Sequence, residues 1–175
     1  MPDVVLDVQA VQSRDHGERG IARYTLDLAL AAHRLAPDLI DAFVLNPALP
    51  IARGLLGLHE TDKLMRADDE RLREGARVFH VASPFESLPL AQVLPAPIVT
   101  QTTRIVTTVY DLIPLRYPGI YLADQHHGES YRGRTALLRA SDHVVCISDA
   151  TACDVATLAG VTPSRVSPIY GGTSD

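Results

Sequence analysis

The sequence lacks the surplus of basic residues that nucleic-acid-binding proteins carry. Its 16 Lys and Arg residues are outnumbered by 21 Asp and Glu residues, which gives a formal net charge of -5. Binding to duplex nucleic acid is driven by clustered Lys and Arg side chains that contact phosphates. The sequence also contains no motif for RNA recognition. We therefore expect no nucleic acid among the partners of this protein.

Cysteines and long apolar runs are scarce as well. Cys146 and Cys153 have neither zinc-ribbon spacing nor the spacing of a redox CxxC pair, so they are expected to be buried, reduced thiols in a cytoplasmic protein. The N-terminus "MPDVVLDVQ" has no basic start followed by a long apolar run, so no signal peptide is evident. The most apolar stretch, residues 42–58, is interrupted by Asn46, two prolines and Arg53. This stretch is too broken for a membrane span of about 20 apolar residues.

What is present suits one globular domain with a parallel sheet. The chain has 175 residues, of which 46% are apolar, and short apolar runs alternate with helical patterns. Strands are expected at residues 4–8, 39–46, 77–82, 104–111, 143–148 and 165–170. Helices are expected at residues 21–36, 67–76 and 149–159, and within 123–140. The pattern predicts an α/β fold: a Rossmann-like, doubly wound, mostly parallel sheet with helices on both faces. A (β/α)₈ barrel would need about 250 residues.

Polar residues follow several of these predicted strands. They are Gly17 and Gly20, Ser83 and Pro84, Tyr110 and Asp111, and Ser148 and Asp149. Ligands of open parallel sheets bind beyond the carboxyl ends of the strands, where connecting loops and helix N-termini gather. Asp111 therefore lies where a site is expected, and Pro114 and Pro118 are expected to fix the following segment as an irregular loop. The alternative is that Asp111 only caps a turn.

The segment "RDHGERGIARYT", residues 14–25, is a second candidate. Its glycines would let backbone amides approach a phosphate at the positive end of the next helix. The segment matches neither GxGxxG nor a P-loop. On spacing alone, an ordinary turn remains the competing interpretation.

The histidines and arginines of the C-terminal half do not define a site. His126 and His127 are adjacent and no HxxxH is present, so a solvated loop is favoured over a metal site. Arg132, Arg134 and Arg139 share a predicted helix with Leu137 and Leu138. They are interpreted as a solvated face, with contact to an anionic lipid or a phosphate as the alternative.

Four segments in order carry a resemblance to a known family. They are "RGIARYTLDLA", "TVYDLIPLRYP", "LLRASDHVVCISDATACDVATLAGV" and "RVSPIYGG". Together they resemble the N-terminal half of a retaining glycosyltransferase of family 4, which has the two-domain GT-B fold. The resemblance covers nearly the whole chain. It implies that this chain is one half of a GT-B fold.

The resemblance also implies roles for individual residues. Gly17, Gly20 and Arg23 correspond to the loop that approaches the phosphates of the donor, although Ala22 stands where a second glycine is common. Tyr110 and Asp111 correspond to the catalytic strand-end pair, which is often His-Asp. A tyrosine can hydrogen-bond a sugar hydroxyl but cannot act as a charged imidazole near neutral pH.

Two further pairs of residues have counterparts in the family. Arg116 and Tyr117 match the loop that faces the acceptor. Ser148 and Thr151 match an S-x-x-T at the helix N-terminus near the cleft, where helix capping is an equally good interpretation.

The resemblance further implies a second domain. In the family, this domain binds most of the nucleotide and supplies a Glu-x₇-Glu motif, which is absent here. Residues 1–170 are expected to form the acceptor-side domain, and residues 171–175 to begin the hinge to a C-terminal nucleotide-binding domain. Two interpretations stay open, a fragment of a longer enzyme and one subunit of a split enzyme. An isolated half would also expose its cleft and self-associate.

The expected function is therefore that of the acceptor-binding domain of a hexosyltransferase-type glycosyltransferase. The enzyme would transfer a sugar from a nucleotide-sugar donor, with retention, to a glycan, a lipid-linked or a small-molecule acceptor. No cofactor and no metal are implied. The expected location is the cytoplasm, with peripheral contact at the inner face of the membrane. The alternative is a non-catalytic binding or partner subunit. A Rossmann oxidoreductase is disfavoured because the first turn lacks GxGxxG.

Overall fold

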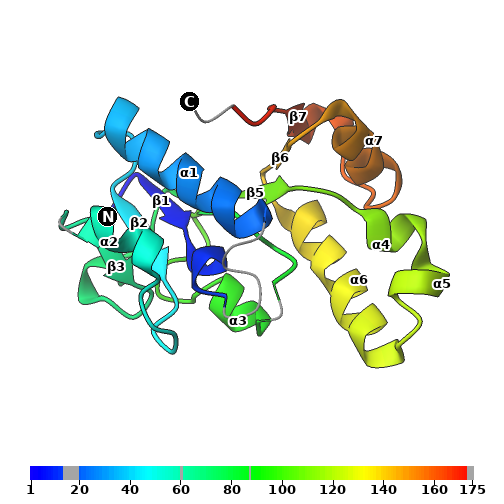
Figure 1. Ribbon diagram of the computed structural model, residues 1–175, viewed down its shortest axis with the longest axis horizontal. Coiled ribbons are helices and arrows are strands. Elements are labelled where there is room, and N and C mark those ends of the chain that lie inside the picture. The colour runs from blue at the N-terminus through cyan, green and yellow to red at the C-terminus, as the bar shows by residue number, and fades with distance from the viewer. Residues whose placement is uncertain (14–19, 60, 87, 173–175) are drawn as a thin grey trace. The chain divides into compact units, whose positions relative to one another are not determined.

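The structure is a computed structural model that describes residues 1–13, 20–59, 61–86 and 88–172 (Figure 1). The chain divides into two compact units, Met1–Arg104 and Ile105–Asp175. Each unit contains parallel strands that are connected through helices. The Rossmann-like α/β architecture expected from the sequence is confirmed.

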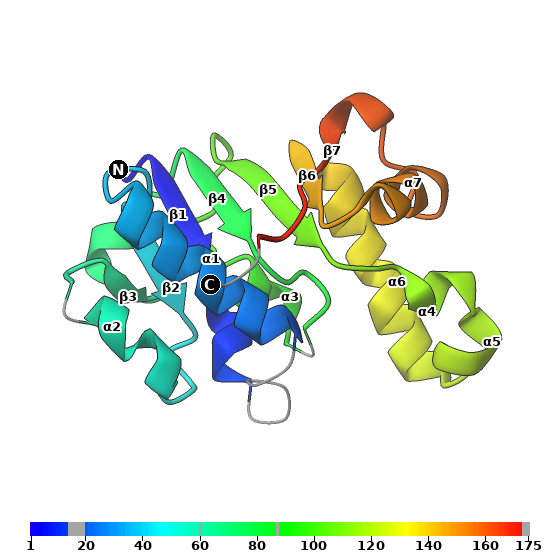
Figure 2. The ribbon, with the colours of Figure 1, turned by 45° about the horizontal axis from the view of Figure 1, so that its top comes forward.

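The first unit contains four parallel strands in the order β3-β2-β1-β4. Their bounds are β1 Val4–Asp7, β2 Ala42–Leu45, β3 Leu64–Arg66 and β4 Val78–Val81. Val5 in the centre of β1 is paired with Ala42 on one side and with Phe79 on the other. Figure 2 shows β1 and β4 running side by side in the same direction. The chain thus builds outward from β1 to β3 and then returns to the other side of β1, as in the Rossmann strand order.

Helices and turns connect these strands. The helices are α1 Gly20–Leu35, α2 Leu56–His59 and α3 Leu90–Val93, and short 3₁₀ turns cover Gln9–Gln12, Arg53–Leu55 and Glu70–Leu72. The predicted charged helix over residues 67–76 is reduced to the last of these turns. Its N-cap Asp69 accepts a hydrogen bond from the backbone of Arg71. Gly75 with a φ of 80° then ends the segment, because that conformation is incompatible with a helix.

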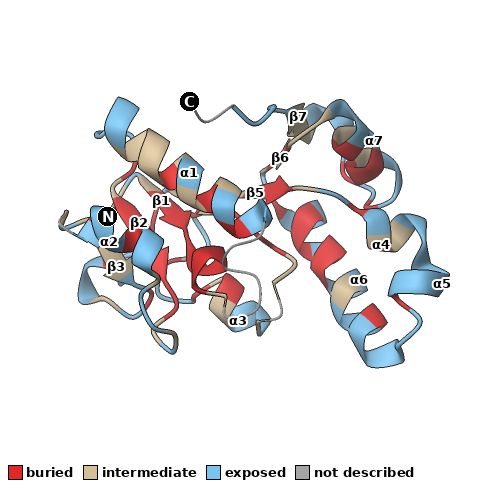
Figure 3. Cartoon of the chain, viewed as in Figure 1, coloured by how far each residue is buried: buried red, intermediate tan, exposed pale blue. Residues whose placement is uncertain are grey.

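The core of the first unit lies between its sheet and the helices α1 and α2. It is built from the following buried residues: Leu6, Val8, Val11, Ala29, Ile40, Phe43, Leu45, Leu55, Leu58 and Ala82. Every residue of β2 is buried, as expected for a strand of a parallel sheet that is covered on both faces. Figure 3 shows the same concentration of buried residues along β1 and β2.

The second unit contains three parallel strands in the order β5-β6-β7. The strands are β5 Arg104–Val109, β6 His143–Cys146 and β7 Val166–Pro168, and a 3₁₀ turn covers Pro163–Arg165. The helices are α4 Ile113–Arg116, α5 Pro118–Tyr121, α6 Gln125–Ala140 and α7 Asp149–Thr157. Helix α7 packs on β6 and β7. The core of the second unit includes five residues that are inaccessible to solvent: Leu112, Leu138, Val144, Cys146 and Val155.

The segment after β5 is more ordered than the sequence suggested. The prediction of an irregular loop braced by Pro114 and Pro118 is wrong, because both prolines lie in the first turn of a short helix, α4 or α5. A proline there loses no hydrogen bond, since the first backbone N–H groups of a helix have no partner within it. The prolines therefore start these helices and fix their position in the chain.

Candidate functional site

A chain of hydroxyl hydrogen bonds connects the end of β5 to the start of α7. Ser148 is the N-cap of α7, and its Oγ accepts a hydrogen bond of 3.1 Å from the backbone N–H of Thr151. The hydroxyl of buried Thr151 donates to the backbone carbonyl of Tyr110 over 2.9 Å. The Ser148 hydroxyl lies 2.9 Å from Thr151 Oγ1 and donates its proton to it, because the proton of the Thr151 hydroxyl is already donated to Tyr110. The structure therefore brings together three of the predicted site residues, Tyr110, Ser148 and Thr151.

The capping role of Ser148 leads to a stability prediction. Replacing Ser148 with alanine removes the N-cap hydrogen bond and is expected to lower the free energy of unfolding by about 1 kcal/mol. Ser148→Thr keeps a capping hydroxyl and serves as the matched control. Urea unfolding followed by circular dichroism measures both variants. Equal stability of the wild type and Ser148→Ala would show that the cap contributes nothing.

Asp111 follows directly in the exposed part of the same segment. Its Oδ1 accepts a hydrogen bond of 3.0 Å from the backbone N–H of Ile113 at the start of α4. Asp111 therefore caps the turn before α4, as the alternative interpretation expected. Burial raises the pKa of Tyr131 on α6 well above its usual range, and the negative charge of Asp111 adds to this. Tyr131 is a neighbour of the strand end that the sequence did not indicate.

Arg116 pairs with a carboxylate on α7, 38 residues further along the chain. Its Nε lies 2.9 Å from Oδ1 and 2.8 Å from Oδ2 of Asp154, and its Nη2 lies 2.6 Å from Oδ1. This fork-shaped contact is the strongest form of an arginine–carboxylate pair, and it raises the pKa of Arg116. Helix α7 thus holds the segment after β5 at two points, through Thr151 and through Asp154.

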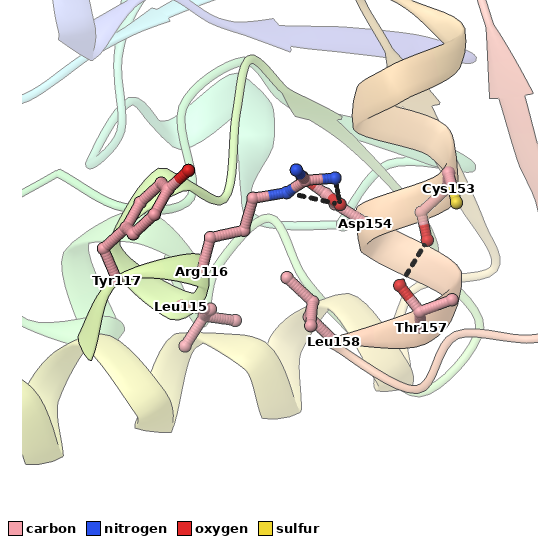
Figure 4. A pocket seen from close by; sticks show the side chains of 7 residues that line it. All are labelled: Leu115, Arg116, Tyr117, Cys153, Asp154, Thr157 and Leu158. Carbon is pink, nitrogen blue, oxygen red and sulfur yellow. Dashed lines mark hydrogen bonds and ion pairs between the residues drawn. The ribbon is translucent and has the colours of Figure 1, made fainter.

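A pocket of about 360 Å³ lies beside this ion pair (Figure 4). It is lined by Leu115, Arg116, Tyr117, Cys153, Asp154, Thr157 and Leu158. The two predicted acceptor-side residues, Arg116 and Tyr117, therefore lie together on the wall of one pocket. Cys153 is exposed there, contrary to the expectation that both thiols are buried.

The interpretation of the α6 arginines as a solvated face is wrong for one of them. Arg134 is only 8% exposed, and burial lowers its pKa. Arg139 donates to the backbone carbonyl of Ala159 over 3.1 Å. Arg132 remains exposed. An unbroken basic face on this helix is thus not formed.

The predicted donor-phosphate residues belong to the first unit. Gly17 lies outside the described residues. Gly20 is exposed and opens α1, and a Cβ added to it would meet no atom within 4 Å. Arg23 is exposed, and its Nε lies 3.9 Å from Oδ2 of Asp27, one turn further along α1. Both described residues are open to solvent at the first turn of the helix.

Sequence reasoning missed a buried carboxyl group at the end of β1. Asp7 is only 3% exposed, and burial raises its pKa from 3.8 to about 7, with a contribution from the nearby charge of Glu86. Its Oδ1 accepts a hydrogen bond of 2.9 Å from the backbone N–H of Gln9. Glu86 accepts a 2.9 Å bond from Ser83 just after β4. The rule that selected Asp111, an acid directly after an apolar strand, applies equally to "VVLD".

Amide side chains surround this carboxyl end of the sheet. Gln12 Oε1 accepts from the backbone N–H of Asn46 over 2.8 Å, and Gln12 Nε2 lies 3.1 Å from the carbonyl oxygen of Pro50. Asn46 Nδ2 donates to Gln92 Oε1 over 3.0 Å. Gln9 Nε2 donates to the backbone carbonyl of Gln92 over 2.9 Å. These bonds tie together the segments after β1 and β2 and helix α3. They do so at the point where the strand order reverses, which is the usual ligand position in such sheets.

No group of three or more His, Cys, Asp or Glu side chains in the described part of the chain could hold a metal ion. No helix among the described residues has the length and apolar character needed to cross a membrane.

Comparison with known proteins shows the family. The sequence profile of Glycosyltransferase Family 4 matches residues 18–175, which is most of the chain. The chain belongs to glycosyltransferase family 4. No curated protein matches it. The family 4 match gives the chain a glycosyltransferase-type function, and the Rossmann-like architecture is that of one GT-B half.

Proposed function

We propose that this family 4 chain is the acceptor-binding domain of a hexosyltransferase that uses a nucleotide-sugar donor and retains the anomeric configuration. The observation that carries the proposal is the family match over residues 18–175. The acceptor is a glycan, a lipid-linked saccharide or a small molecule. The nucleotide binds mainly to a second domain, and no metal or cofactor takes part.

The proposed roles of individual residues are those that the family resemblance implies. Tyr110 and Asp111 border the transferred sugar, with the phenol and the free carboxylate oxygen hydrogen-bonding its hydroxyls. The amides at the first turn of α1, beginning at Gly20, together with Arg23, approach the donor phosphates, where a helix N-terminus favours negative charge. Fixed amides and cations of this kind stabilise the charge that develops on the leaving phosphate. The hydrogen-bond chain from Ser148 through Thr151 to Tyr110 supports this proposal, because it holds the strand end in one position.

The proposal predicts that the 175-residue chain alone does not turn over a donor. The purified chain is incubated with UDP- and GDP-sugars and with saccharide acceptors, and the released nucleoside diphosphate is measured. We expect release at the background rate, because this half lacks most of the nucleotide contacts. Sustained transfer by the isolated chain would contradict the prediction.

The product of the whole protein tests the function itself. Protein made from the native reading frame, together with any separately encoded nucleotide-binding subunit, is expected to transfer sugar. The anomeric configuration of the product is then read by NMR. Asp111→Asn is expected to lower the transfer rate. Transfer with inversion, or an active Asp111→Asn variant, would overturn the assigned chemistry.

A further inference from the structure

The pocket beside α7 combines one ion pair with apolar walls. Arg116 reaches from α4 toward Asp154 on α7, and Tyr117 lies on the side of Arg116 away from α7 (Figure 4). Leu115 and Leu158 line the pocket beneath the ion pair in this view. Small-molecule sites are commonly about 300–1,000 Å³ in volume and mostly apolar, with a few placed polar groups. The volume of about 360 Å³ lies at the small end of this range, and the pocket is open to solvent, with Tyr117 and the two leucines supplying its apolar surface.

The ion pair keeps unused hydrogen-bonding capacity on the wall of the pocket. A guanidinium group carries five N–H donors, and the bonds to Asp154 involve only Nε and Nη2. Among the described residues, none accepts a hydrogen bond from Nη1 of Arg116. Asp154 Oδ2 receives only the bond from Nε. The pair thus presents donors and an acceptor side by side while its net charge is zero.

The apolar walls contain exposed surface that needs an explanation. Tyr117 is 54% exposed and Leu158 is 43% exposed. The described part of the chain offers the Tyr117 hydroxyl no hydrogen-bond partner. An aromatic ring with a free hydroxyl suits a molecule that has an apolar face and a polar edge. A pyranose ring has this character, since its C–H groups gather on its faces and its hydroxyls lie at the rim.

We propose that this pocket binds one neutral saccharide unit, with the ring of Tyr117 against an apolar sugar face and the Arg116–Asp154 pair hydrogen-bonding adjacent hydroxyls. An anionic ligand would meet the carboxylate of Asp154, and a cationic ligand would meet Arg116, so a neutral ligand fits the balanced charge. The inference deepens the proposed function. It rests on that function only in assigning the bound saccharide to the acceptor.

The test is binding of simple glycosides to the 175-residue chain in the absence of a donor. Methyl α-glucopyranoside, methyl α-mannopyranoside and methyl α-galactopyranoside are titrated into ¹⁵N-labelled protein, and amide shifts are followed by NMR. At least one glycoside is expected to give saturable shifts confined to residues 115–117 and 153–158. The same titration with inorganic phosphate is expected to give no saturable shift there.

Matched variants locate the binding. Tyr117→Ala is expected to weaken binding roughly tenfold, because the aromatic platform is lost. Tyr117→Phe keeps the ring and is expected to lose only about two- to threefold in affinity. The control is Tyr121→Ala, which removes another exposed tyrosine that does not line the pocket and is expected to bind like the wild type. The dispersion of each variant's amide spectrum shows that it is folded.

Three outcomes would overturn the inference. They are the absence of saturable shifts for all three glycosides, equal affinity of wild type and a folded Tyr117→Ala variant, and binding of phosphate in place of the glycosides. Because the titration involves no donor and no transfer, its failure leaves the transferase proposal standing. Conversely, saturable binding by a protein that never transfers sugar would contradict the proposed function and keep the saccharide site.

Discussion

Replacing Asp7 with asparagine is expected to raise the free energy of unfolding by about 4 kcal/mol at pH 8 and to leave it nearly unchanged at pH 3.5. Burial raises the pKa of this carboxyl group from 3.8 to about 7. One pKa unit corresponds to about 1.4 kcal/mol, so the buried charge destabilises the fold by about 4 kcal/mol once it forms. Asparagine keeps an Oδ1 acceptor for the backbone N–H of Gln9 but never ionises. The gain is large against a typical stability of about 5–15 kcal/mol.

The sign of this pH dependence follows from proton counting. Between pH 3.8 and about 7, the folded protein binds the Asp7 proton more tightly than the unfolded protein does. The stabilising contribution of Asp7 to the free energy of unfolding is therefore fully present below pH 3.8, the pKa in the unfolded protein. It is lost as the pH rises through about 7, the pKa in the folded protein. Urea unfolding of wild type and Asp7→Asn at a series of pH values measures the difference. Hydrogen exchange of the β1 amides assigns it to the first unit. A constant difference between the two proteins across this range would refute the raised pKa.

Replacing His80 on β4 with glutamine is expected to have the opposite pH dependence. Burial lowers the pKa of His80 from 6.5 to about 4, since the charged ring is disfavoured inside the protein. Between about pH 4 and 6.5, His80 therefore binds a proton in the unfolded protein but stays neutral in the folded protein. The contribution of His80 to the free energy of unfolding is therefore fully present above pH 6.5, and the free energy of unfolding falls by about 3 kcal/mol as the pH falls to 4. His80→Gln removes this loss. The free energy of unfolding of the variant, relative to that of the wild type, is therefore expected to be about 3 kcal/mol higher at pH 4 than at pH 7.5.

The two groups oppose each other between about pH 4 and 6.5. The wild-type stability is therefore expected to be nearly flat in this window, and each single variant should reveal the slope of the other group. Asp7→Asn becomes less stable as the pH falls, while His80→Gln becomes more stable. The double variant should be flat again. Parallel pH profiles for all four proteins, measured by urea unfolding, would show that neither group titrates as described.

The sequence predicted the long elements well and the short ones poorly. Helix α1 and strand β5 were placed to within two residues at each end, because helical apolar spacing up to Pro37 marks α1 and a run of β-branched residues marks β5. Strand β3, Leu64–Arg66, was missed: three residues at the sheet edge, none of them buried, carry no pattern. The helices α4 and α5 were also missed, since a proline is read as a breaker unless the start of a helix is already known.

The contacts among the candidate site residues were foreseeable only where the signal is local. Tyr110 and Ser148 were predicted because polar residues stand at the ends of apolar runs, whereas Thr151 was implied only by the family resemblance; hydrogen bonds connect the three residues. The pairing of Arg116 with Asp154 could not be predicted, because it joins residues far apart in the sequence and depends on how α7 packs. The burial of Arg134 was missed for the same reason.

The two thiols differ in a way that has a practical use. Cys146 is enclosed in β6, and burial raises its pKa to about 11, whereas Cys153 is exposed on the wall of the pocket next to Arg116. Alkylating reagents attack thiolates that they can reach. The native sequence thus already contains a selective attachment point for a fluorophore or spin label, placed where an occupant of the pocket would be sensed.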